Sequence, residues 1–207
     1  VLDPACGSAG MFVQTGHFIE EVRHKHTVDT DITFYGQEKA DLNSKLARMN
    51  LAVHGLEGQI RIGNTFYDDH HHLLGQCDFV MANPPFNMKE WWNAKLENDV
   101  RWKYGTPPQG NANFAWMQHM ISHLAPKGKI GLVLANGSLS TTTSGEGEIR
   151  KNIIEADLVE GIVALPSNLF YSVTIPVSLW FISRDKKQKG KTIFIDARKM
   201  GEMVDRK

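Results

Sequence analysis

The chain has 207 residues, of which 42% are hydrophobic and 22% charged, a balance typical of one globular domain with a sizeable core. Lys plus Arg and Asp plus Glu both number 23, so the formal net charge is zero. That balance excludes the general basic excess with which proteins bind DNA tightly by themselves, and we expect the chain alone to bind DNA poorly. Cys6 and Cys77 show neither metal-like nor disulfide-like spacing, which favours a reducing, cytoplasmic location.

No apolar run is long enough to span a membrane, and no secretory signal opens the chain. The first residue is Val1 rather than Met, and the sequence opens inside an apparent strand. We interpret residues 1–207 as a single domain excised from a longer protein.

Strand-like and helix-like segments alternate along the chain, a pattern typical of α/β proteins with a mostly parallel sheet. In chain order, the predicted strands are 1–3, 32–35, 60–62, 78–82, 129–134, 159–165, 173–183 and 192–195. The predicted helices are 11–26, 40–54, 114–124 and 149–155. In the second helix, Leu42, Leu46, Met49 and Val53 are expected to form the buried face. The strand at 173–183 follows its predecessor without a helix, so it is expected to run antiparallel.

Two long segments, 87–111 and 136–147, are predicted to lack regular structure. The first interleaves aromatic and basic side chains, a composition that suits nucleic acid. These residues are Trp91, Trp92, Arg101, Trp102, Lys103 and Tyr104. Packing on another domain or a partner is the alternative. We expect this segment to be mobile without DNA, because it would lack an ordering partner.

A turn of small residues joins the first strand to the first helix; residues 3–10 read Asp-Pro-Ala-Cys-Gly-Ser-Ala-Gly. Small residues let a ligand approach the backbone, and the helix N-terminus presents unpaired amides. Ala5 stands where a dinucleotide fingerprint has its first glycine, and the Gly-Lys-Ser/Thr ending of a P-loop is missing. A ligand site and a plain strand–helix turn are equally compatible with this segment by itself.

Glu38 ends the second predicted strand. In nucleotide-type sheets, an acid at this place accepts hydrogen bonds from ribose hydroxyls. The alternative is an ordinary acidic residue at a helix N-terminus, which by itself the sequence favours.

Asn83, Pro84, Pro85 and Phe86 directly follow the fourth predicted strand. Two prolines fix the backbone and cannot donate an amide hydrogen, so carbonyl groups and the Asn83 amide oxygen remain as aimed acceptors. Such acceptors suit a neutral amine, and Phe86 could stack on a flat ring. A rigid turn is the alternative. The three features all follow strands, and the carboxyl ends of strands are where open α/β sheets bind ligands.

The turn at 3–10 together with Asn-Pro-Pro-Phe resembles the cofactor and catalytic motifs of amino-methylating DNA methyltransferases. Later stretches resemble the modification subunit of type I restriction–modification systems. They are Asn-Ala-Asn-Phe-Ala-Trp at 111–116, Gly-Lys-Ile-Gly-Leu-Val-Leu-Ala-Asn-Gly at 128–137, Ile149-Arg150, and Leu-Pro-Ser-Asn-Leu-Phe at 165–170. The similarity covers essentially the whole chain.

The resemblance implies a seven-stranded, Rossmann-like methyltransferase sheet, mostly parallel with one antiparallel strand and helices on both faces. It implies S-adenosylmethionine as the cofactor, in preference to a dinucleotide. The implied cofactor-binding residues are Asp3, Ala5, Gly7, Ser8, Gly10, Glu38, Asn64 and Thr65; the implied catalytic residues are Asn83, Pro84, Pro85 and Phe86. Asn64 departs from the family, which often has an acid near the cofactor adenine. The family also has an upstream helical domain, which this sequence lacks.

The implied reaction is methylation of the 6-amino group of a flipped adenine in DNA, with a specificity subunit and a restriction subunit as partners. The catalytic motif is shared with protein-glutamine and some RNA methyltransferases, so these activities remain alternatives, as does a non-catalytic DNA-clamping module. His70, His71 and His72 beside Asp68 and Asp69 could suggest a metal. Consecutive side chains point in different directions, however, and we predict a solvated loop and no metal site.

Overall fold

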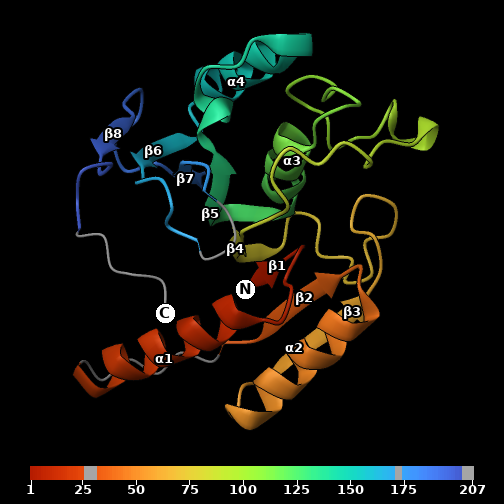
Figure 1. Cartoon of the computed structure of the whole chain (residues 1–207), viewed down its shortest axis with the longest axis vertical. Helices are drawn as coiled ribbons and strands as arrows, with labels where there is room; N and C mark the ends of the chain where they lie inside the picture. The colour runs from red at the N-terminus through yellow and green to blue at the C-terminus, as the bar shows by residue number, and fades with distance from the viewer. Residues whose placement is uncertain (26–31, 171–173, 202–207) are drawn as a thin grey trace.

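The computed structural model describes residues 1–25, 32–170 and 174–201, and in this part of the chain eight strands form one sheet (Figure 1). The strands are β1 (Leu2–Asp3), β2 (Phe34–Glu38), β3 (Gly58–Ile62), β4 (Cys77–Ala82), β5 (Leu124–Ala135), β6 (Val159–Ala164), β7 (Val177–Ser183) and β8 (Ile193–Asp196). Their order across the sheet is β3-β2-β1-β4-β5-β7-β6-β8. The residue pattern predicts eight strands, which this confirms, whereas the count of seven implied by the resemblance was one too low, because β8 pairs in parallel with the outer edge of β6.

All neighbouring strands run parallel except β7, which is antiparallel to both β5 and β6. This confirms the mostly parallel α/β sheet and the antiparallel direction predicted for 173–183; Val173 itself lies outside the described residues. β5 is longer than predicted, because it begins at Leu124 directly after the preceding helix.

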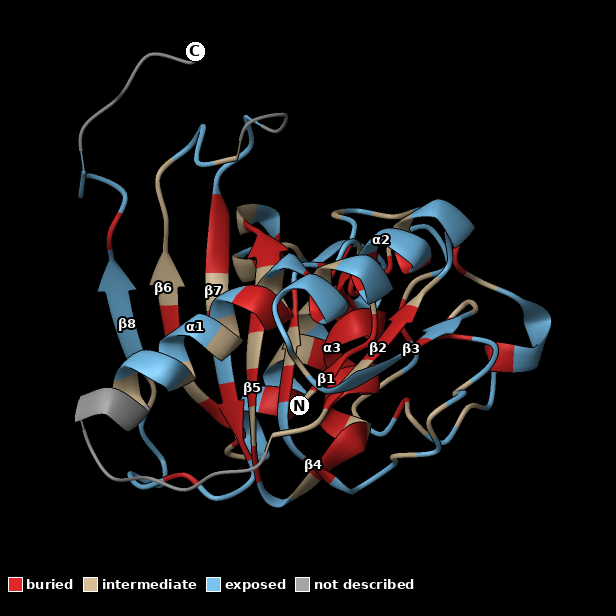
Figure 2. Cartoon of the chain, turned by 90° about the horizontal axis from the view of Figure 1, so that it is seen from below, coloured by how far each residue is buried: buried red, intermediate tan, exposed pale blue. Residues whose placement is uncertain are grey.

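Helices cover both faces of the sheet (Figure 1). α1 (Gly10–Lys25) and α2 (Asp41–Val53) lie on one face, and α3 (Asn113–His123) and α4 (Glu146–Glu155) lie on the other. His26, predicted to end the first helix, lies outside the described residues. α3 is buried at every position except Ser122, and with the central strands it forms the main core (Figure 2). No described helix combines the length and hydropathy that a membrane span needs.

The predicted buried face of α2 was wrong. Leu42, Leu46, Met49 and Val53 are all exposed, with Val53 at 78%. The face that contacts the sheet instead carries the buried Ser44, Ala47 and Leu51. Small side chains let α2 approach β3 closely, and a Cβ added at Gly58 would lie only 2.8 Å from Leu51 Cδ1. The periodicity of large apolar residues predicted the wrong side of the helix, because α2 packs closely on the sheet through the side that carries its small residues.

Residues 87–111 build a small core of their own instead of an open loop. Trp91 is fully buried, and Trp102 and Leu96 are nearly so; all three pack in one cluster with Phe66 and Trp116. Trp91 Nε1 donates to the carbonyl of Pro108 at 3.2 Å, and a short 3-10 helix, η1, spans Ala94–Leu96. The buried faces of Trp91 and Trp102 are therefore not available to stack on bases, and the mobility of this segment without DNA stays a prediction.

Residues 136–147 contain regular structure, contrary to the prediction. Two 3-10 helices, η2 (Asn136–Leu139) and η3 (Thr143–Gly145), lead into α4, which begins three residues before its predicted start. The Arg150 guanidinium donates to the carbonyls of Ser138 and Thr141 at 3.3 and 2.6 Å. Such side-chain bonds to the backbone replace periodic structure and leave no signal in hydrophobic patterning.

Candidate active site

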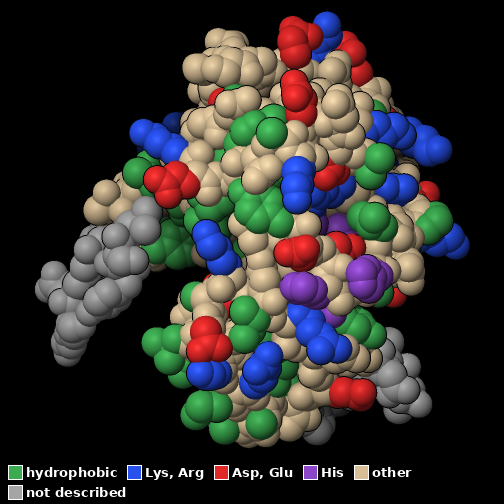
Figure 3. All heavy atoms as spheres, turned by 90° about the vertical axis from the view of Figure 1, so that its right-hand side faces the viewer, with side chains coloured by type: hydrophobic (Ala, Val, Ile, Leu, Met, Phe, Trp, Pro, Cys, Tyr) green, Lys and Arg blue, Asp and Glu red, His purple; other side chains and the backbone are tan. Residues whose placement is uncertain are grey.

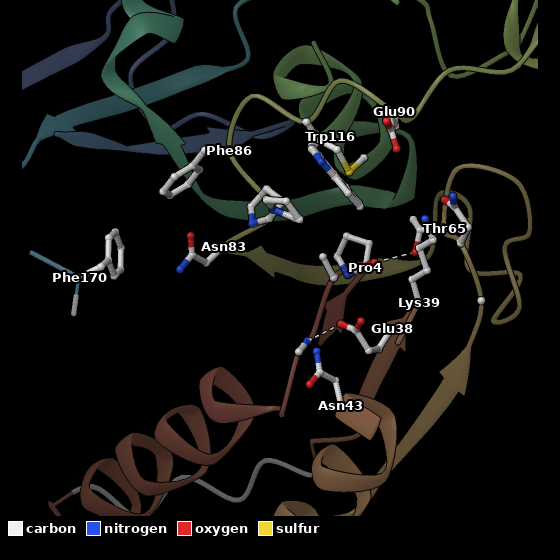
Figure 4. Close-up of a pocket in the computed structure, with 17 residues that line it drawn as sticks. Pro4, Glu38, Lys39, Asn43, Thr65, Asn83, Phe86, Glu90, Trp116 and Phe170 are labelled. Atoms are coloured by element: carbon white, nitrogen blue, oxygen red, sulfur yellow. Dashed lines mark hydrogen bonds between the residues drawn. The ribbon is translucent and has the colours of Figure 1, made fainter. Parts of the chain in front are cut away.

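The strand order reverses between β1 and β4, which are adjacent although the chain builds β2 and β3 outward on the far side of β1. In open α/β sheets a crevice forms at the carboxyl ends of the strands at such a point. A cavity of about 480 Å³ opens here, within the usual range for small-molecule sites. Its wall contains residues from the turn after β1, the end of β2, the turn after β3 and the segment after β4 (Figure 4).

The turn after β1 is held in place by two acidic side chains. Gly7 N donates to Glu38 Oε2 at 3.0 Å, and Ala5 N donates to Asp3 Oδ1 at 2.9 Å. Gly7 has φ of +54°, a left-handed conformation that favours glycine. Ala5, Gly7 and Glu38 line the cavity together, as their expected role in one ligand site requires.

Asp3 lies beneath this turn and is 2% exposed. Burial in the protein interior raises the pKa of its carboxyl group to about 7, and the nearby Glu38 charge acts in the same direction. Asp3, Ser8 and Gly10 are not among the described residues that line the cavity. Asp3 shapes the turn through its bond to the Ala5 amide. Ser8 does so through its carbonyl, which accepts from Asn50 Nδ2 at 2.7 Å, and Gly10 begins α1.

The turn after β3 forms a second wall of the cavity, with both Asn64 and Thr65 lining it. Thr65 Oγ1 donates to the carbonyl of Pro4 at 2.6 Å, which ties this turn to the turn after β1 (Figure 4). Asn64 Oδ1 accepts from the amide of Phe66 at 3.1 Å. One lone pair of the Asn64 oxygen is therefore used within its own turn, and the second remains for a ligand.

Asn83, Pro84, Pro85 and Phe86 all line the cavity, at the carboxyl end of β4. The chain leaves this motif through Asn87, which has φ of +54° and is held by α3. Asn87 N donates to Asn113 Oδ1 at 3.0 Å, and Asn113 Nδ2 donates to Asn87 Oδ1 at 2.8 Å. Asn113 is 3% exposed. The resemblance drew attention to the stretch 111–116, and this pairing shows that part of it fixes the end of the Asn-Pro-Pro-Phe motif.

The site also contains residues that the sequence did not single out. They are Lys39, Asn43, Met88, Glu90, Trp116 and Phe170. Phe170, from the segment between β6 and β7, has its ring centroid 6.2 Å from that of Phe86. Phe86, Asn83 and Phe170 lie together at one side of the cavity, and Lys39 and Thr65 at the other (Figure 4). Trp116 and Phe170 belong to stretches that carried the resemblance, but no local pattern shows that they reach this cavity.

The histidine-rich segment has contacts of a different kind. His71 Nε2 lies 2.9 Å from the carbonyl of Gly36, and Asp69 Oδ2 lies 3.3 Å from His123 Nε2. Hydrogen bonding to His123 lowers the pKa of Asp69 despite partial burial. Within the described residues, no three or more His, Cys, Asp or Glu side chains are grouped so that they could hold a metal ion.

An α/β sheet with this strand order, one antiparallel strand near its edge and a cavity at the strand reversal defines a Rossmann-like fold of the methyltransferase type. The chain belongs to the N-6 DNA methylase family, because the sequence profile of that family matches residues 1–207.

Named relatives agree with this assignment. The chain is 54% identical over 207 residues to the type I restriction enzyme HindI methylase subunit of Haemophilus influenzae, covering 100% of this chain and 46% of that protein. It is 44% identical over 215 residues to the MjaIX methylase subunit of Methanocaldococcus jannaschii, covering 100% and 38%. The crystal structure of a type I restriction–modification methyltransferase subunit from Streptococcus thermophilus superposes with a TM-score of 0.81 at 26% identity, covering 99% of this chain and 43% of that one. The chain thus spans less than half the length of these relatives.

Proposed function

We propose that this chain is the catalytic domain of a site-specific DNA methyltransferase that moves a methyl group from S-adenosylmethionine to the 6-amino group of adenine. One observation carries the proposal: Asn83, Pro84, Pro85 and Phe86 line the same cavity as the turn after β1 and Glu38. Hydrogen-bond acceptors suited to an amine and residues suited to a nucleoside therefore line the same cavity.

One half of the cavity, which we call the cofactor half, is lined by Ala5, Gly7, Glu38, Asn64 and Thr65. Its hydrogen-bond donors and acceptors suit S-adenosylmethionine. Glu38 would hold the ribose hydroxyls, since each carboxylate oxygen keeps a free lone pair after accepting one amide. Ala5 and Gly7 would leave room for the methionine part, and Asn64 and Thr65 would border the adenine. When bound, the cofactor supplies an electrophilic methyl group. Asp3, Ser8 and Gly10 would act by shaping the turn.

The target half would receive an adenine that has left the duplex, because its amine is out of reach within the stack. Phe86 and Phe170 would bracket the flat ring. The Asn83 side-chain oxygen and the Pro84 carbonyl would accept the two amine hydrogens, which draws the nitrogen lone pair out of conjugation with the ring. Pro85 keeps these acceptors fixed. Catalysis then comes from positioning and electrostatics, without a covalent enzyme intermediate.

We further propose that the chain works in a type I restriction–modification complex, with a specificity subunit and a restriction subunit. The relatives' names as methylase subunits of type I restriction enzymes support this. The surface also supports a need for partners, because acidic and basic side chains are interspersed on the face that Figure 3 shows, and the net charge is zero. Other subunits would then supply much of the contact with the phosphate backbone.

Asn83→Ala in the assembled complex tests the mechanism. Methyl transfer to target DNA should fall roughly a hundredfold to a thousandfold, the usual effect of losing one pre-aimed group. Cofactor affinity, measured in parallel by calorimetry, should stay within about twofold, because Glu38 and the turn after β1 remain. Asn152→Ala is a matched control: within the described residues this exposed α4 side chain donates only to the Tyr104 carbonyl, and its loss should change neither quantity.

Two results would contradict the proposal. Near wild-type methylation by the Asn83 variant would remove Asn83 from the chemistry. Methyl transfer by the wild-type complex to a glutamine-containing peptide or to RNA, but not to adenine in DNA, would move the activity to another substrate class.

A further inference from the structure

The Arg101 guanidinium lies behind the wall formed by the turn after β3, and its side chain is 9% exposed. Its Nε and one Nη2 hydrogen donate to the two oxygens of Asp99, at 2.8 and 2.6 Å. Nη2 also donates to the Phe66 carbonyl at 2.6 Å, and Nη1 to the Thr65 carbonyl at 3.2 Å. The remaining Nη1 hydrogen faces His119 Nδ1 at 2.9 Å. An arginine side chain has five N–H donors, so every donor of Arg101 has an acceptor.

These bonds join three separate parts of the chain. Arg101 belongs to the segment that follows Asn-Pro-Pro-Phe, Thr65 and Phe66 to the turn after β3, and His119 to α3. Thr65 lines the cavity, and so does Trp116, one helical turn before His119. The Phe66 ring packs on Trp116 with centroids 4.3 Å apart. Arg101 is not one of the residues that line the cavity, so any effect on a ligand must pass through these neighbours.

The charge of Arg101 is compensated where it is buried. Burial acts to raise the pKa of Asp99, but hydrogen bonds from Arg101 outweigh it and the pKa is lowered, so Asp99 is a carboxylate. Burial keeps the pKa of His119 well below its ordinary value, which leaves Nδ1 free to accept. The arrangement needs a planar fork of donors, which a lysine ammonium with three donors on one atom does not provide.

We propose that Arg101 is a positioning residue for the cofactor: it fixes the turn of Asn64, Thr65 and Phe66 and ties it to the segment behind the Asn-Pro-Pro-Phe motif. The inference rests on the proposed function, because it takes this turn as part of the S-adenosylmethionine pocket. Hydrogen bonds from a charged donor are stronger than those between neutral groups, so the turn is held firmly in the free protein. Without these bonds the cofactor itself would have to order the turn on binding, and a cost of about 1.4 kcal/mol corresponds to a tenfold loss of affinity.

The first measurement is S-adenosylmethionine affinity of the 207-residue chain by calorimetry. Arg101→Ala should weaken binding about tenfold or more, and Arg101→Lys should not restore it. Millimolar guanidinium should partly restore affinity to the alanine variant, whereas sodium at equal ionic strength should not. Arg48→Ala is the matched control, because this guanidinium donates to the Ile60 carbonyl on β3; its affinity should stay within about twofold of wild type.

The second measurement needs no cofactor. The amides of Tyr67 and Asp68 donate to the Asn64 carbonyl at 2.8 and 3.0 Å. Their hydrogen exchange should be about tenfold faster in Arg101→Ala, while exchange in β5 stays unchanged. If the wild-type chain binds no S-adenosylmethionine, the proposed function fails, and faster exchange in the variant still supports the positioning of the turn by Arg101.

Wild-type affinity in a folded Arg101→Ala variant would overturn the inference, whatever the exchange rates. Weakened affinity with unchanged exchange would also overturn it, because the turn would not have moved. If the alanine variant does not fold, Arg101→Lys takes its place in both measurements, and wild-type affinity there would be equally decisive.

Discussion

Asp3→Asn tests whether the carboxylate beneath the turn after β1 titrates near neutral pH. In the folded protein, burial raises the pKa of Asp3 to about 7 from its ordinary 3.8. Between these two values the folded state holds a proton on Asp3 that the unfolded state has released. Unfolding then releases protons, so this group makes the protein less stable as pH rises from about 4 to about 7, with no further change above that range.

The size of the effect follows from the shift. One unit of pKa corresponds to about 1.4 kcal/mol, so the Asp3 contribution should fall by about 2 kcal/mol between pH 5 and pH 7. Other buried or half-buried groups change stability over the same range: Glu146, whose pKa is raised, in the same direction, and His71 and His119, whose pKa values are lowered, in the opposite one. The difference between wild type and Asp3→Asn isolates the one side chain, because the asparagine oxygen can still accept from Ala5.

The assay is urea unfolding of both proteins, without cofactor, at several pH values from 5 to 8. The wild-type free energy of unfolding, relative to that of the variant, should decrease by about 2 kcal/mol from pH 5 to pH 7 and then level off. A difference that is constant with pH, or that increases, would show that Asp3 is ionised in the folded protein throughout and would refute the reasoning.

Three further outcomes are expected. Phe170→Ala should lower methyl transfer by the assembled complex about tenfold to a hundredfold, since stacking on one base contributes about 1–3 kcal/mol, and should leave cofactor affinity unchanged; an unaffected rate would remove Phe170 from the target site. Trp91→Ala should destabilise the chain by about 3–5 kcal/mol in denaturant unfolding, as for other fully buried tryptophans; a loss below about 1 kcal/mol would mean that the 87–111 segment does not pack as described. Calorimetry should show S-adenosylmethionine binding and weaker or no NAD binding, because the turn after β1 lacks the dinucleotide fingerprint; equal or tighter NAD binding would contradict the cofactor assignment.

Much of the sheet was predictable because its strands are short apolar runs bounded by turn residues. The antiparallel β7 also followed from the lack of a helix before it. The buried side of α2 was not predictable from periodicity, because Ser44 and Ala47 contact the sheet through their small size. In the segment 87–111, Trp91 and Trp102 have the same local composition whether they stack on bases or on each other, and only tertiary packing separates the two cases.

Residues after strand ends were the most predictable part of the candidate site. Parallel strands bring their carboxyl ends to one edge, so Gly7, Glu38 and Asn83 could be expected around one cavity. Phe170 and Trp116 enter from segments that are distant in sequence, and no spacing rule connects them to that edge. Arg101 was grouped with nucleic-acid contacts on composition, whereas its hydrogen bonds all point inward.

The two amide hydrogen bonds accepted by Glu38, from Gly7 at 3.0 Å and from Ala40 at 2.8 Å, have an entropic consequence. A free glutamate side chain loses rotational freedom when it binds a ligand, at a cost of about 0.5–1.5 kcal/mol. Glu38 has lost that freedom on folding. A nucleoside that binds to this carboxylate therefore meets a rigid acceptor, and the affinity gained from its hydroxyls is not reduced by ordering the side chain.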